Sequence, residues 1–304
     1  MGSDPLAQTF LISPQQYPQG LYLSKIRLCF KSKDSTVPVT LQLRPTVNGY
    51  PSSSVVYPFS TVSLTPDKVK TSASPDMDNS TKYTEFVFDS PVYMQPGEHS
   101  FVLLANSNKY EVYVAEIGKL DTVTGRQISE QPYGGSLFLS QNGSTWNADQ
   151  TSDMMFRLYR NSYSTSSVSV QFTVAYPATV VPYEVAHLIT SDITVANTSL
   201  SYRANTEKAD GSGFTGLTAI TPLKNFEITD GVGRKLSNTS GNITFTLVGT
   251  MSTLSNDVSP MIDVSRMGIV TIENKINNLG LSNSGIVVSN VGSGYANSTD
   301  VTVT

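Results

Sequence analysis

Two pairs of acidic residues in this sequence are of a type that could carry out catalysis. Asp76 and Asp78 lie in a loop rich in proline and serine, and Asp149 and Asp153 follow Trp146. Hydrolysis of a glycosidic bond needs two carboxyl groups that face each other across a sugar. Nothing in the spacing of either pair predicts such a facing arrangement. We therefore interpret these acids as solvated loop residues and predict no catalytic residue.

Trp146 is the only tryptophan of the chain, and it stands in a polar loop beside Asn147. An indole ring in such a loop can stack on a sugar ring, with Asn147 and the nearby Tyr133 as further contacts. The alternative is a ring that anchors a strand crossing by packing on Phe138 and Phe156. We favour packing, and we keep Trp146, Tyr133 and Asn147 as the candidate binding residues for a glycan or a protein partner.

Side chains that bind metals or nucleotides are scarce. Cys29 is the only cysteine, and the two histidines, His99 and His187, are far apart in sequence, so we predict neither a disulfide nor a zinc site. Asp210-Gly211-Ser212-Gly213 and Asp230-Gly231 lack the alternating oxygen ligands of a calcium-binding loop, and we interpret them as turns. The Gly-x-Gly motifs open no helix, which argues against a dinucleotide site. We expect no metal and no cofactor.

The composition excludes several classes of protein. The chain has 304 residues, of which 14% are charged, and its formal net charge is -4. Its basic residues are scattered, whereas a nucleic-acid-binding protein gathers them on one face. No apolar run approaches the ~20 residues of a membrane span. The N-terminus has neither the basic part nor the apolar part of a signal peptide. We therefore expect no nucleic-acid binding and no membrane insertion.

Apolar and polar residues alternate with a period of two through the first half of the chain, which predicts strands. Ile26, Leu28 and Phe30 form one such run, with Cys29 on its polar phase, and residues 37–43 form the next. The short polar turn between these runs predicts that they pair as an antiparallel hairpin. Further short strands follow, and no segment shows a helical period. We predict an all-β fold that begins with a jelly-roll-like β-sandwich over residues 4–160.

The second half of the chain predicts another mainly-β module. Residues 161–167 are small and polar, which is typical of a linker, and the module extends over residues 168–283. For residues between Pro260 and Asn278 the pattern fits either a short helix or a strand, and we do not choose between them. Strands are expected at Val168–Val174, Glu184–Thr190, Ser199–Ala204 and Ile243–Val248.

Residues 284–304 contain strand-like runs that predict the start of a further, truncated β module. An isolated hairpin is marginally stable in water. We therefore expect this segment to be mobile or paired with a neighbouring chain.

Several motifs are distinctive enough to compare with known families. They are Asp4-Pro5-Leu6-Ala7-Gln8-Thr9-Phe10, Gly20-Leu21-Tyr22-Leu23-Ser24-Lys25-Ile26, Leu43-Arg44-Pro45-Thr46-Val47-Asn48-Gly49-Tyr50-Pro51, Gln131-Pro132-Tyr133-Gly134-Gly135-Ser136-Leu137-Phe138 and Asp153-Met154-Met155-Phe156-Arg157-Leu158-Tyr159. Together they resemble virion structural proteins of contractile-tailed bacteriophages, the myovirus type including cyanophages, over about residues 4–160. Gly292-Ser293-Gly294-Tyr295 resembles the β modules that such proteins often carry. The resemblance implies a location in the virion tail after assembly in the host cytoplasm, and it carries no catalytic site.

The function expected from these features is that of a non-enzymatic structural component of a phage tail, baseplate or tail-fibre apparatus. It would act through contacts with other virion proteins, as a homo-oligomer for which a trimer is one option. Neutral hydroxyl and amide side chains, which dominate the polar phases of the strands, lose water at less cost than charges. The alternative is a carbohydrate-binding module of a tail fibre or secreted adhesin that recognises a host surface glycan. A jelly roll hosts both functions, so the fold alone does not decide between them.

Overall fold

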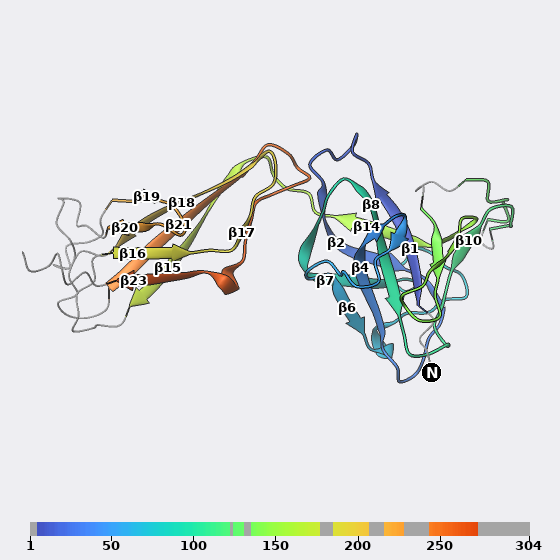
Figure 1. Cartoon of the computed structure of the whole chain (residues 1–304). Helices are drawn as coiled ribbons and strands as arrows, with labels where there is room; N and C mark the ends of the chain where they lie inside the picture. Colours follow the sequence, from blue (N-terminus) through green and yellow to red (C-terminus); the bar gives the residue numbers. More distant parts are fainter. Residues whose placement is uncertain are drawn as a thin grey trace, which may run out of the picture. The chain divides into compact units, whose positions relative to one another are not determined.

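A computed structural model of the chain describes residues 5–121, 124–130, 135–176, 185–206, 216–227 and 243–272. These residues form strands and turns, with short 3₁₀ turns at Pro66–Lys68 and Val264–Arg266. The predicted all-β fold is confirmed. The chain divides into two compact units, each described here by itself (Figure 1). Unit 1 takes the described residues within 1–168, 193–200 and 251–261, and unit 2 takes the others.

The larger sheet of unit 1 has the strand order β12-β11-β1-β8-β4-β5, and β6 also pairs with β4. Every pairing in this sheet is antiparallel. Its strands are β1 (Leu6–Ile12), β4 (Val39–Val47), β5 (Tyr50–Pro51), β6 (Thr61–Leu64), β8 (Gly97–Leu104), β11 (Leu137–Leu139) and β12 (Asn147–Asp149).

A smaller antiparallel sheet completes the sandwich of unit 1, with β2 between β14 and β7 (Figure 1). Phe10, Leu41 and Phe101 from the larger sheet and Ile26 and Phe86 from the smaller one are at most 1% exposed and share one core cluster. The period-two alternation supplies this core, because every second side chain of each strand points inward. The strands of this sheet are β2 (Leu21–Leu28), β7 (Thr84–Met94) and β14 (Phe156–Arg160). Two further pairs of short strands are β3 (Phe30–Ser32) with β9 (Glu111–Val112), and β10 (Val114–Glu116) with β13 (Ser152–Met154).

The predicted hairpin between the runs at Ile26–Phe30 and residues 37–43 is wrong. β2 pairs with β7 and β14, whereas β4 belongs to the other sheet and pairs with β8. The Asp34 carboxylate accepts the N–H groups of Thr36 and Val37 at 2.8 and 3.1 Å and shapes the connection that leads to β4. Alternation identifies strands but carries no information about which strands pair, so a polar turn alone does not establish a hairpin.

Cys29 lies between β2 and β3 and is fully buried, although the alternation places it on the polar phase. The regular strand stops at Leu28 and resumes at Phe30, so three consecutive side chains are buried there. The thiol lies 3.9 Å from the sulfur of Met77 and belongs to a small cluster with Tyr83. Burial raises the pKa of the Cys29 thiol, which disfavours the reactive thiolate.

The later part of the chain forms two sheets, ordered β15-β21-β18-β19 and β20-β16-β23, and the short pair β17-β22. The pairings of β16 with β20 and β23 and of β18 with β19 are antiparallel. Most residues of the two sheets belong to unit 2, but 193–200 and 251–261 cluster with unit 1. Strands lie where the alternation predicts them, and the region left open between helix and strand contains two strands and a 3₁₀ turn. The strands of this part of the chain are β15 (Ser167–Tyr176), β16 (Val185–Ile189), β17 (Asp192–Ile193), β18 (Thr198–Thr206), β19 (Thr218–Ile220), β20 (Asn225–Glu227), β21 (Ile243–Thr253), β22 (Met261–Ile262) and β23 (Gly268–Ile272).

The segment predicted as a linker, residues 161–167, contacts unit 1 at Asn161 and Tyr163, whereas residues 164–167 are exposed. The Asn161 N–H donates to the Tyr22 carbonyl at 2.9 Å, and the Tyr163 ring packs edge-on against the Tyr22 ring at 5.8 Å. The Tyr163 N–H donates to the carbonyl of Asn256 at 2.8 Å. Asn256 lies in 251–261, which clusters with unit 1 although the sequence assigns it to the module at 168–283. The predicted further module, residues 284–304, lies outside the described residues.

Candidate functional site

Trp146 packs on the face of the larger sheet that points away from the core of unit 1. Its neighbours Ala7, Val102 and Phe138 come from the adjacent strands β1, β8 and β11. Only 7% of Trp146 is exposed, so its ring offers no open face on which a sugar could stack. The packing on Phe138 matches the favoured interpretation. Phe156, the other expected neighbour, packs instead in the core of the sandwich.

The other two candidate binding residues do not join Trp146 on one surface. The backbone of Asn147 pairs with that of Leu139, and the Asn147 side chain is exposed. Tyr133 lies outside the described residues. Within the described part of the chain, these candidates therefore form no common binding surface.

The acids near Trp146 are held by local hydrogen bonds. The Asp149 carboxylate accepts the N–H and the hydroxyl of Thr151 at 3.0 and 2.8 Å. Hydrogen bonds from Ser152 and then Thr151 lower the pKa of Asp149. Asp153 accepts a hydrogen bond of 2.6 Å from the buried amide of Gln8. Asp149 is thus tied to its own turn, whereas Asp153 is tied to β1 of the larger sheet.

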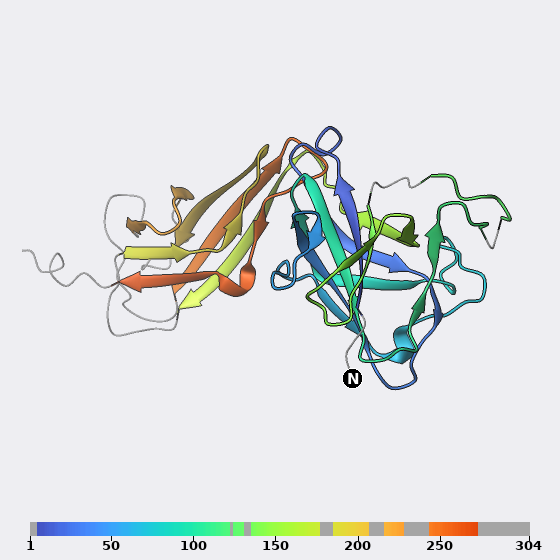
Figure 2. The ribbon, with the colours of Figure 1, turned by 45° about the vertical axis from the view of Figure 1, so that its right-hand side comes forward.

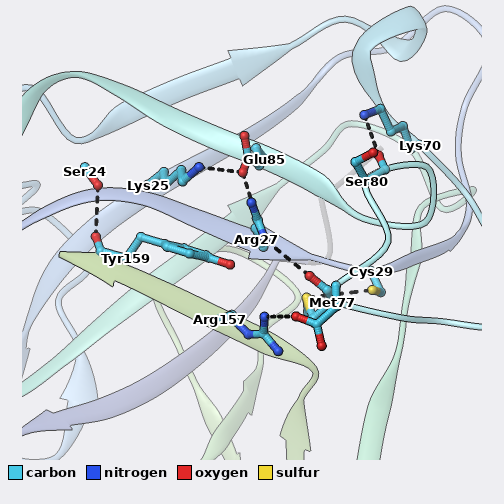
Figure 3. Close-up of polar contacts among 11 residues, drawn as sticks. Ser24, Lys25, Arg27, Cys29, Lys70, Met77, Ser80, Glu85, Arg157 and Tyr159 are labelled. Carbon is cyan, nitrogen blue, oxygen red and sulfur yellow. Dashed lines mark hydrogen bonds and ion pairs between the residues drawn. The ribbon is translucent and has the colours of Figure 1, made fainter. Parts of the chain in front are cut away.

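The outer face of the smaller sheet carries cations beside tyrosine rings. Figure 3 shows Lys25, Arg27, Glu85 and Tyr159 of this group. The Arg27 guanidinium lies between two rings, 4.0 Å from the centre of Tyr83 and 4.5 Å from that of Tyr159. The Lys25 ammonium lies 4.8 Å from the centre of the Tyr159 ring. Glu85 accepts hydrogen bonds from both Lys25 and Arg27 at 2.7 Å. We call these five residues the basic–aromatic array.

Lys25 and Arg27 share the single carboxylate of Glu85 in this array. Burial alone would raise the pKa of Glu85, but the hydrogen bonds from Lys25 and Arg27 outweigh it and lower that pKa. Beside the array, the hydrogen bond and ion pair with Asp78 raise the pKa of Arg157 and lower that of Asp78 (Figure 3). These ion pairs link β2 to β7, and β14 to the loop that contains Asp78.

Sequence reasoning missed the basic–aromatic array. Lys25 and Arg27 follow the period-two pattern and share one face of β2, which was visible in the sequence. Two of their partners, Glu85 on β7 and Tyr159 on β14, lie about 60 and 135 residues further along the chain. They come close to Lys25 and Arg27 because Arg27 lies opposite Glu85 on one neighbouring strand and opposite Arg157 on the other. Only the pairing of the sheet reveals that they meet.

The loop of residues 52–60, between β5 and β6, presents apolar side chains to solvent. Val55 is 52% exposed and Phe59 is 60% exposed. Phe59 adopts φ +60, a left-handed conformation that costs a non-glycine residue about 1–2 kcal/mol. A bulky side chain that is both strained and exposed contributes little to folding, and such strain is concentrated at functional sites.

Hydrogen bonds anchor this loop to the neighbouring strand β4. The Tyr57 N–H donates to the Leu43 carbonyl at 3.0 Å, and the fully buried Ser60 hydroxyl lies 3.2 Å from the same oxygen. The Tyr57 hydroxyl lies 2.8 Å from Nδ1 of His99, whose Nε2 lies 2.7 Å from the carbonyl of Gln95. Nε2 donates to that carbonyl, because a carbonyl oxygen only accepts, and in the neutral imidazole Nδ1 then accepts the hydrogen bond of the Tyr57 hydroxyl. Burial lowers the pKa of His99, in keeping with the neutral form.

Two more exposed apolar residues lie just before this loop. Asn48 and Gly49 have φ +53 and +79, which suits the tight turn that joins β4 to β5. The flanking residues Val47 and Tyr50 are 56% and 49% exposed. We call Val47, Tyr50, Val55 and Phe59 the edge surface, because all four belong to the stretch that runs from the end of β4 through β5 to the start of β6. Within it, the Tyr50 ring packs edge-on against the Phe138 ring of β11 at 5.7 Å.

The described ranges contain no group of three or more His, Cys, Asp or Glu side chains that could hold a metal ion. In the same part of the chain, no helix has the length and hydropathy needed to cross a membrane. Neither the comparison with protein-family models nor the comparison with curated proteins finds a significant match.

Proposed function

We propose that this chain is a non-enzymatic structural component of a bacteriophage tail, baseplate or tail-fibre apparatus. In this proposal it is assembled in the host cytoplasm and holds its place through contacts with other virion proteins. The edge surface is the observation that supports contact with proteins. The placement in a phage tail rests on the resemblance of the motifs within residues 4–160 to myovirus virion proteins.

The edge surface has the properties of a protein contact site. Aromatic side chains held in place before binding contribute most to interface affinity, because little conformational entropy is lost on association. Tyr50 and Phe59 are exposed aromatic residues, and the Tyr50 ring packs edge-on against Phe138 at 5.7 Å. Hydrogen bonds from Tyr57 and Ser60 to Leu43 anchor the backbone on both sides of Phe59. Neutral hydroxyls at the exposed Ser53 and Ser54 lose water at less cost than charges would.

The alternative functions have less support. A carbohydrate-binding module would need an open aromatic face, and its main candidate, Trp146, is covered by the sheet. A polysaccharide-cleaving enzyme would need facing carboxyl groups, whereas Asp149 and Asp153 are engaged with Thr151 and Gln8. We therefore favour the structural role.

Immunogold electron microscopy of purified phage particles, with an antibody against this chain, tests the virion location. We expect label on the tail of the phage that encodes the chain. Particles that lack the chain would contradict the proposal. A glycan array and an assay for released reducing ends, run on the same purified chain, test the carbohydrate-binding and enzymatic alternatives, and we expect neither to be positive.

A Phe59→Gly variant tests the edge surface itself. Glycine tolerates φ > 0, so we expect the free energy of unfolding to change by less than about 1 kcal/mol. Incorporation of the chain into particles should fall, because the exposed aromatic contact is lost. Val87→Ser is the matched control, since Val87 is also an exposed apolar residue, at 53%, but lies on β7 in the other sheet. Equal incorporation of both variants and of the wild type would remove the edge surface from the proposal.

A further inference from the structure

We infer that unit 2 pairs with a second copy of this chain through antiparallel alignment of the two β15 strands. β15 is the terminal strand of its four-stranded sheet, and no described strand pairs with its other edge. The strand has ten residues, so one edge presents a long row of backbone N–H and C=O groups. Such an edge is a template for the addition of another strand.

Proteins that stay monomeric protect exposed strand edges with charges, prolines or short length. The two terminal strands of the smaller sheet in unit 1 follow this rule. β7 contains Glu85, Asp89 and Pro91, and β14 contains Arg157 and Arg160. β15, with the sequence SVSVQFTVAY, has neither a charged residue nor a proline. Its edge is therefore unprotected against pairing.

The side chains of β15 are incompletely covered on both faces. Ser169, Gln171 and Thr173 are exposed on one face, whereas Val168 is 53% exposed on the other. Phe172, on the same face as Val168, is half-buried. In a strand of a closed sandwich one face is normally buried, so the apolar face of β15 is available to gain contacts from a neighbouring strand.

A groove of about 430 Å³ lies beside β15 in unit 2. β15 and β23 lie next to each other in both views of the molecule and line this groove together (Figure 1, Figure 2). Leu247 is buried in it, and Val264 at its rim is 66% exposed. The full lining is Gln171, Phe172, Thr173, Leu247, Val264, Met267, Gly268 and Ile269, none of which is charged. An uncharged strand added beside β15 fits this lining better than a charged one.

β15 of a second copy has the required chemistry. When two identical strands pair antiparallel about a two-fold axis, residues of the same period-two phase lie opposite each other. The apolar residues of both copies then share one face, and the hydroxyl and amide residues share the other. No like charges meet, because neither strand is charged. The inference rests on the proposed role in assembly, to which it adds a surface and a partner.

Charge exchange on β15 tests the inference with the full chain. Gln171 and Thr173 are both exposed, so Gln171→Lys with Thr173→Lys should leave the fold intact, as checked by circular dichroism and thermal unfolding. By light scattering we expect a dimer for the wild type and monomers for the double-lysine variant and for the matching double-glutamate variant. An equimolar mixture of the two variants should restore the dimer. Ser201→Lys with Thr218→Lys, exposed on β18 and β19, adds the same charge away from β15 and should remain dimeric.

Three results would overturn the inference: a monomeric wild type, an oligomer that persists in the double-lysine variant, or no dimer in the mixture. The virion location is measured separately by immunogold labelling. A chain found in the tail that fails the charge exchange would retain the proposed function and lose the β15 interface. If the chain forms a dimer that depends on β15 but is absent from phage particles, the β15 interface is retained and the proposed function is rejected.

Discussion

Single residues of this chain acquire their roles from neighbours that are distant in sequence. The polar loop around Trp146 allows both glycan stacking and packing. Ala7 and Val102 decide between these roles, because small side chains on adjacent strands leave room for the indole on the sheet. His99 is similar: burial lowers its pKa and favours the neutral ring, which links Tyr57 of the loop 52–60 to the carbonyl of Gln95.

We expect Trp146→Ala to destabilise unit 1 by about 3–5 kcal/mol, the usual cost of removing a large buried aromatic side chain. Chemical denaturation of the variant and of the wild type measures the difference. Asn147→Ala, one residue further and exposed, is the matched control and should change the free energy of unfolding by less than about 0.5 kcal/mol. A Trp146→Ala chain as stable as the control would contradict the packing role.

The buried His99 should make folding stability depend on pH. Burial lowers the pKa of His99 in the folded chain below the value of about 6.5 that it has when unfolded. Between those two pKa values the unfolded chain binds more protons, so the free energy of unfolding falls as the pH falls below about 6.5. The stabilisation is fully present above that pH. Urea unfolding from pH 7.5 to pH 5 should show a shallower decline for His99→Gln than for the wild type, and parallel curves would refute the assignment.

At the scale of strands, contacts between side chains of the smaller sheet hold its register. The basic–aromatic array joins β2 to both of its neighbours, with Arg27 packed between Tyr83 and Tyr159 and bonded to Glu85. Planar guanidinium groups stack on aromatic rings better than ammonium groups do. The Arg27 side chain is only 16% exposed, so its interactions are less screened than those of a surface pair.

We expect Arg27→Ala to lower the free energy of unfolding by about 2 kcal/mol, from the lost stacking and the lost charged hydrogen bond. Lys31→Ala is the control, because the ion pair of Lys31 with Glu111 is exposed on both sides, at 63% and 54%. Such a surface pair contributes less than about 1 kcal/mol. Denaturant titrations of both variants give the comparison, and equal effects would show that the array is not a stabilising unit.

At the scale of the whole molecule, unit 1 includes two segments from the later part of the chain. The Tyr22 hydroxyl donates to the carbonyl of Ser259 at 3.0 Å. Arg160 forms an ion pair with Asp257 at 2.9 Å, with side chains 34% and 19% exposed. Both partners lie in residues 251–261, which cluster with unit 1. Unit 1 is therefore not a continuous stretch of sequence.

A fragment that ends at Ser166 tests this organisation. It retains every strand of the sandwich but lacks the partners of Tyr22, Arg160 and Tyr163. We expect it to fold with a thermal midpoint about 5 °C or more below that of unit 1 in the full chain, since 1 kcal/mol shifts the midpoint by ~2–4 °C at this size. Calorimetry measures both midpoints. Identical midpoints would mean that residues 251–261 add nothing to unit 1.

The amino-acid sequence by itself determined the all-β class, the positions of most strands and the scarcity of metal ligands among its cysteines and histidines. It did so because period-two alternation and residue counts are local properties. The tertiary structure decided which strands pair, that Cys29 and Trp146 are buried, and that Arg27 meets Glu85 and Tyr159. It also showed that, among the described strands, β15 pairs with β21 alone. These features depend on contacts between segments tens to more than a hundred residues apart, and no local pattern specifies which distant strand becomes a neighbour.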